Sequence, residues 1–141
     1  AASLSRACVK RATLASANRW LNDPRILPAI ANRPLDLSVV WQHVVMFEFT
    51  AGTVGFHHGE DGQWSMHLCL VPGSGTAHAC VKRALRAVFC RSDCLRIQCA
   101  PDSNNIRAVR FMHKTGFRCT GQHGAFTVFL LEKPTFFLEQ S

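Results

Sequence analysis

A glycine-rich junction follows the apolar segment at residues 68–71. Residues 72–76 (Pro-Gly-Ser-Gly-Thr) lead from this segment into a helical pattern that begins at Ala77. Glycine lets the backbone approach a ligand closely, and the free N–H groups and dipole of a helix start attract anions. A pyrophosphate suits such a turn. The alternative is an ordinary strand-to-helix turn, in which glycine and serine are also common.

Histidines near this junction are candidates for acid–base chemistry. His67 shares a predicted strand face with Cys69 and Val71, and its ordinary pKa near neutrality suits a general base. The alternative for His67 is a histidine packed and hydrogen-bonded inside the sheet. His57, His58 and Glu60 lie at the end of a predicted hairpin that could face a substrate, but plain surface positions are the favoured interpretation. A cysteine nucleophile is disfavoured because no Cys–His–acid order stands out.

Composition and charge limit the classes of function. The chain has 141 residues, 48% of them hydrophobic and 18% charged, and a formal net charge of +7. Between residues 74 and 118 there are nine Lys or Arg and two acidic residues. Such a field favours anionic partners, although a solvated helix face is an equal interpretation. Nucleic acid is the least favoured partner, because the chain has no tyrosine and its Phe residues lie in core-like patterns.

The cysteines favour a reducing compartment. Seven are present, an odd number without a disulfide framework, and Cys69, Cys80 and Cys99 lie in apolar runs. We expect a cytoplasmic protein. No metal site is expected, because Cys90 and Cys94 lack further ligands. No run approaches the ~20 apolar residues of a membrane span. The basic N-terminal segment resembles a transit peptide in composition, but an ordinary first helix is the favoured interpretation.

Periodicity predicts the elements that position these residues. Helices are expected at 3–21, 26–30, 77–89 and 105–115, and strands at 44–49, 53–57, 64–71, 95–100, 117–121 and 125–131. Glu48 is expected to face solvent. The apolar residues 135–138 could cap the sheet or join a partner. The order predicts an α/β (α+β) fold, with a mixed, partly parallel sheet flanked by helices. We expect one domain over 1–141, with N-terminal helices at 1–38 and a core at 43–133.

Residues 105–117 (NIRAVRFMHKTGF) carry a specific resemblance. The segment has Asn at a helix start, Ala three positions on, and a final Gly-Phe. It resembles the second signature of the GNAT acetyltransferases, and the resemblance extends over residues 43–133. Within that family the chain is most similar to small phage-encoded or prophage-encoded members, and this resemblance would place it in a host cytoplasm or a virion. The similarity rests on residues 22–26 (NDPRI), residues 34–37 (PLDL) and His67.

The resemblance implies acetyl-coenzyme A as co-substrate and assigns residues to its parts. The strand of Cys69, Leu70 and Val71 would splay from its neighbour and pair with the pantetheine arm. Asn105 would contact the same arm. The basic face of the 77–89 helix would favour the phosphates. The pyrophosphate would lie on the loop and helix start formed by Ser74, Gly75, Thr76 and Ala77.

Two departures from the family pattern bear on catalysis. Ser74 stands where the family has Arg or Gln, and the loop is one residue short. Met112 stands where many members have the tyrosine that protonates the leaving thiolate. His113 is the neighbouring candidate acid, with a solvent-facing histidine as the alternative, and His67 is the candidate base. The expected function is N-acetylation of an unidentified amine. The alternative is a non-catalytic GNAT-fold protein that binds an assembly partner, in a virion or a homo-oligomer.

Overall fold

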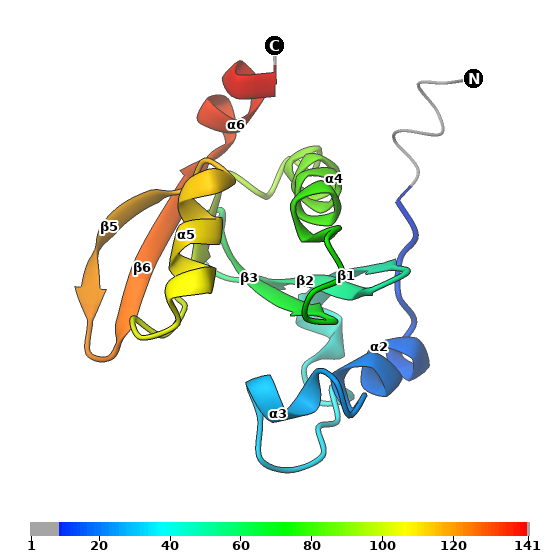
Figure 1. Cartoon of the computed structure of the whole chain (residues 1–141). Helices are drawn as coiled ribbons and strands as arrows, with labels where there is room; N and C mark the ends of the chain where they lie inside the picture. The colour runs from blue at the N-terminus through cyan, green and yellow to red at the C-terminus, as the bar shows by residue number, and fades with distance from the viewer. Residues whose placement is uncertain (1–8, 141) are drawn as a thin grey trace.

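The computed structural model describes residues 9–140 (Figure 1). As far as residue 132 its main helices and strands follow the predicted order, and a helix that was not predicted follows them. The helices and strands of this part of the chain are α2 (Leu14–Leu21), α3 (Leu27–Ile30), η1 (Trp41–His43), β1 (Val44–Phe49), β2 (Gly52–His58), β3 (Gln63–Leu70), α4 (Ala77–Phe89), β4 (Arg96–Cys99), α5 (Ile106–Lys114), β5 (Arg118–His123), β6 (Phe126–Glu132) and α6 (Lys133–Gln140). No helix between residues 9 and 140 is long and apolar enough to cross a membrane.

The described strands form one mixed sheet in the order β1-β2-β3-β4-β6-β5. β3 and β4 run parallel, and every other neighbouring pair is antiparallel. Parallel neighbours cannot be joined by a tight turn, so α4 carries the chain across the sheet between them. The predicted mixed, partly parallel sheet flanked by helices is confirmed.

Helices cover both faces of the β1–β3 meander (Figure 1). α4 lies on one face, where its apolar residues recur every three or four positions and form a buried stripe. That stripe packs with Trp64, Phe56 and Ile97 of the sheet in the main core. α2 and α3 lie on the opposite face, where Ala17 and Leu21 pack with Met46 and Cys69 in a second cluster.

The first helix is shorter than predicted. We expected it from residue 3, but α2 begins at Leu14, and residues 3–8 lie outside the described part. Thr13 ends the preceding extended segment because its hydroxyl accepts a hydrogen bond from the Ser16 N–H at 3.0 Å. Residues 10–12 instead bond to β1: the Glu48 N–H donates to the Lys10 carbonyl at 2.8 Å.

The expectation that Glu48 faces solvent is wrong. Its side chain is 12% exposed, and it accepts a 3.0 Å hydrogen bond from the Trp20 indole N–H. Lys10 and Arg19 approach the same carboxylate at 3.9 and 3.7 Å. The hydrogen bond from Trp20 is the main cause that lowers the pKa of Glu48. This carboxylate therefore ties α2 and the N-terminal segment to β1.

The C-terminal helix caps the chain's own core. Phe136 is 1% exposed, and its ring centroid lies 5.3 Å from that of Phe89 in α4. We had expected residues 135–138 either to cap the sheet or to join a partner, and Phe136 packs within its own chain. Leu138 is 76% exposed.

Leu85 provides a test of the α4 packing, because its side chain is fully buried in the main core. Leu85→Ala should lower the free energy of unfolding by about 2–5 kcal/mol, since it removes buried methyl groups and leaves a cavity. Leu138→Ala, the matched control, should change it by less than about 0.5 kcal/mol. Urea denaturation of both variants measures the difference, and equal losses would contradict this packing.

Candidate functional site

The centre of the candidate site is the gap where β3 and β4 separate. Their parallel pairing covers only three positions and ends at Ser65 opposite Gln98. β3 continues to Leu70, still paired with β2 on its other side. β4 ends at Cys99, and Pro101, which has no N–H to donate, follows two residues later. The end of β3 therefore has an open edge within the sheet.

Backbone groups of Leu68 and Leu70 point into this gap. The Val71 N–H donates to the Ala51 carbonyl at 2.7 Å, and the Gly59 N–H donates to the Gln63 carbonyl at 2.9 Å. The odd-numbered residues of β3 thus direct their polar groups toward β2. In an antiparallel ladder the direction alternates, so Leu68 and Leu70 present N–H and C=O groups to the open side. We had expected Cys69, Leu70 and Val71 to form this edge, and Leu68 was missed.

A cavity of about 560 Å³ extends from the gap along the α2–α3 face of the meander. Its inner end lies between β3 and the start of α5, and its outer end lies against the segment that joins α2 to β1. The lining residues include Leu21, Ile30, Leu35, Leu37, Val40, Val44, Met46, His57, Ser65, His67, Leu68, Cys69, Gln98, Cys99, Ala108 and Met112.

The glycine-rich loop lies beyond the end of β3 and offers open space. Gly73 and Gly75 both have φ +76°, a conformation that favours glycine, and a Cβ at either position would meet nothing within 4 Å. Thr76 precedes the first turn of α4 without a side-chain cap. The N–H groups of that turn, which starts at Ala77, thus remain available to an anion. Ser74 holds its hydroxyl 3.2 Å from that of Thr76.

His78 is a polar residue at this helix start that sequence reasoning missed. Its Nδ1 is buried and has no hydrogen-bond partner in the described chain. Burial lowers the pKa of His78, and Lys82 and Lys114 lower it further. Its position in the first turn after a glycine loop was the signal that could have found it.

His67 lies on the wall of the cavity with an exposed side chain, so the packed alternative is wrong. Desolvation by the surrounding wall lowers the pKa of His67 below 6.5, and the nearby His57 lowers it further. His57 pairs across the sheet with Ser65, two residues before His67. The ring centroid of His57 lies 6.2 Å from that of His43. A lowered pKa leaves His67 neutral at pH 7, the form that accepts a proton.

Two thiols line the same cavity. Burial raises the pKa of Cys69 and of Cys99 to about 11. Both are therefore protonated at neutral pH, and a thiol is a weak nucleophile. A cysteine nucleophile is therefore disfavoured in this cavity.

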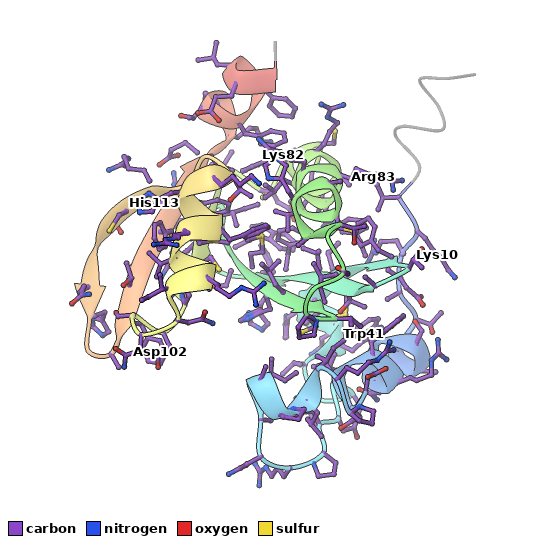
Figure 2. The ribbon with its side chains drawn as sticks, in the orientation of Figure 1. Lys10, Trp41, Lys82, Arg83, Asp102 and His113 are labelled. Atoms are coloured by element: carbon purple, nitrogen blue, oxygen red, sulfur yellow. The ribbon has the colours of Figure 1, made fainter. Side chains whose placement is uncertain are left out.

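Other predicted residues lie apart from the cavity lining. Asn105 caps α5, where its side chain accepts a 3.2 Å hydrogen bond from the Ala108 N–H. His113 lies edge-on to Phe129 of β6, with the ring centroids 5.1 Å apart, on the side of α5 away from α4 (Figure 2). Met112, in contrast, lines the cavity and is 1% exposed.

The predicted basic face of α4 divides in two. Lys82 lies over the Phe136 ring at 5.8 Å, while Arg83 lies over the Phe49 ring at 5.6 Å. The two side chains leave α4 in opposite directions (Figure 2). They do not form the single face toward the loop that the sequence led us to expect.

The fold is shared with acetyltransferases of known structure. A structure of the aminoglycoside acetyltransferase AAC(6')-Ib with coenzyme A matches 95% of this chain and 100% of its own, with 19% identity and a TM-score of 0.75. A chimeric spermidine N-acetyltransferase SpeG, from Vibrio cholerae and hSSAT, matches 92% and 97%, with 15% identity and a TM-score of 0.73. A GNAT-family acetyltransferase from Bacillus anthracis matches 89% and 94%, with 13% identity and a TM-score of 0.65.

These likenesses show that the chain has the GNAT fold. No protein-family model and no curated protein sequence matches it.

The protonated cavity thiols lead to a labelling prediction. At pH 8 roughly one in a thousand Cys69 or Cys99 side chains would be a thiolate, since the pKa of each is about 11. Alkylation by iodoacetamide, mapped by mass spectrometry, should modify the exposed Cys90 and Cys119 first. Cys69 and Cys99 should react only after unfolding in urea. Equal rates in the folded protein would contradict this description of the cavity.

Proposed function

We propose that the protein transfers the acetyl group of acetyl-coenzyme A to the nitrogen of an amine. The observation that carries this proposal is the open edge of β3 at Leu68 and Leu70, which ends at a glycine loop and an uncapped helix start. The solved structures with the same fold support it, because structures of AAC(6')-Ib among them hold coenzyme A or acetyl-coenzyme A.

The residues fit the donor's chemistry along its length. Leu68 and Leu70 would pair with the amides of the pantetheine arm as a neighbouring strand would. Gly75 and the first turn of α4, from Ala77, would receive the pyrophosphate. The exposed ammonium of Lys114, which is near enough to His78 to lower its pKa, would face phosphate oxygens near the same helix start. Asn105 would act through the position of α5, which it caps.

The transfer needs a base and a polarised carbonyl. When bound, acetyl-coenzyme A supplies a thioester that a neutral amine can attack. The amine nitrogen bonds to the carbonyl carbon, the carbon–sulfur bond breaks, and the sulfur keeps the electron pair. The neutral imidazole of His67 takes the amine proton, directly or through one water. An N–H of the open β3 edge would stabilise the charge on the carbonyl oxygen.

The leaving thiolate has no tyrosine to protonate it. Met112 occupies the expected position, and a thioether cannot donate a proton. His113 lies over Phe129, apart from the cavity lining. Water is therefore the proton donor in this proposal.

A second candidate function follows from Met112. A GNAT fold without its usual acid could bind the donor, or a protein partner, without turnover. The narrower resemblance to phage-encoded members supports this candidate, in which the partner would be another protein of an assembly. Saturable binding of acetyl-coenzyme A with no turnover on any amine would favour it.

Donor binding is tested by a glycine substitution with a matched control. Isothermal titration of acetyl-coenzyme A should give saturable one-to-one binding, and Gly75→Arg should abolish it by filling the open space at the loop. Gly124 has φ +61° and equally open surroundings, but it lies in the β5–β6 turn. Gly124→Arg should therefore bind as the unaltered protein does. Unchanged affinity in Gly75→Arg would overturn the placement of the pyrophosphate.

The role of His67 is tested by the pH dependence of its loss. His67→Asn should lower kcat/KM by roughly 10²–10⁴-fold at pH 8, the usual contribution of a general base. Because the pKa of His67 is lowered, the imidazole should protonate only below pH 6.5, where the advantage of histidine over asparagine should shrink. At each pH, the ratio of kcat/KM of the unaltered protein to that of His67→Asn is independent of the titration of the amine, because both proteins use the same substrate. A ratio independent of pH would assign His67 a structural role.

A further inference from the structure

We propose that the acceptor is a small monoamine with an apolar body, rather than a polyamine or an aminoglycoside. This inference rests on the proposed function, because it names the substrate class of the same site. It concerns the outer end of the cavity, between the α2–α3 segment and the meander.

The outer wall of the cavity is aliphatic. It is built by Ile30, Leu35, Leu37 and Val40 from the segment after α2, and by Val44 and Met46 from β1. Ile30 and Val40 remain 39% and 37% exposed in the described structure. Large aliphatic side chains left open at a cavity mouth gain free energy when an apolar ligand covers them.

No carboxylate lines this cavity within residues 9–140. Two carboxylates on the adjoining elements lie outside the lining. Asp36 accepts hydrogen bonds from the Asn18 amide and the Ser38 hydroxyl, both at 3.0 Å. Glu48 accepts a hydrogen bond from the Trp20 indole N–H and lies 3.9 Å from the Lys10 ammonium. The described cavity wall itself therefore presents no negative charge to a ligand ammonium.

The lining side chains with a basic nitrogen are His57 and His67. Neither supplies the negative charge that would hold a second cationic centre on the acceptor.

This combination penalises polycations. Each ammonium that enters an apolar wall without a partner loses its hydration with no compensating charge. The neighbouring structures include a spermidine N-acetyltransferase and an aminoglycoside acetyltransferase with kanamycin, whose named substrates carry several amino groups. A monoamine such as 2-phenylethylamine has one nitrogen to deliver to His67, and its ring and methylenes can cover the aliphatic wall.

The test is acceptor binding, measured apart from turnover. Titration of 2-phenylethylamine and of spermidine into protein saturated with coenzyme A should show the monoamine binding at least tenfold more tightly. Spermidine binding as tightly or more tightly, or no binding of the monoamine, would overturn the inference. Failure of coenzyme A itself to bind would instead count against the proposed function, and titration of the amines into the free protein would still decide the acceptor class.

Paired variants locate the preference on the wall. Val40→Glu adds a carboxylate at the cavity mouth and should reduce the ratio of monoamine to spermidine affinity at least tenfold. Val39→Glu is the matched control, because Val39 is 84% exposed and does not line the cavity. It should leave the ratio within about twofold. The same change in both variants would show that net charge, not the wall, sets the preference.

Discussion

The incomplete pairing of β3 with β4 is the constraint on which the rest of the structure depends. Hydrogen bonds join the strands over three positions, and β3 then runs on to Leu70 with one edge free. A free edge inside a sheet is costly unless something pairs with it, because buried backbone groups need partners. The gap therefore presents Leu68 and Leu70 to a ligand that can mimic a strand. The glycine loop lies beyond the end of β3, and the cavity extends from the gap along the α2–α3 face.

Packing on both faces holds this geometry. On one face, Trp64 and Ile97 are buried where the strands still pair, and Met112 of α5 joins the same core beside the gap. On the other face, the Glu48–Trp20 hydrogen bond fixes α2 against β1. The main core thus joins the meander to β4 and β6, while α2 covers the other face of the meander. Electrostatics then set the chemistry, since the wall around His67 keeps it neutral and no carboxylate enters the described cavity.

The sequence predicted the helices and strands in which apolar residues recur at regular spacing. It missed the features that depend on contacts with distant parts of the chain. Periodicity placed β3 and α4, because alternating and helical burial leave direct patterns in the sequence. It misplaced the start of α2, since the extended residues 10–12 depend on bonds to β1 that lie more than 30 residues away. The orientation of His67 stayed open between two alternatives, and only the position of the cavity decides it. The aliphatic wall escaped prediction because residues 30–40 show no regular period.

The central claim is that the open edge of β3 receives the donor as a strand would. Residue-resolved amide hydrogen exchange, with and without saturating acetyl-coenzyme A, tests it directly. The account predicts that the Leu68 and Leu70 amides exchange fast in the free protein and become strongly protected with the donor, while the Val71 amide, already bonded to Ala51, changes little. Saturable donor binding that leaves the Leu68 and Leu70 amides unprotected would contradict it.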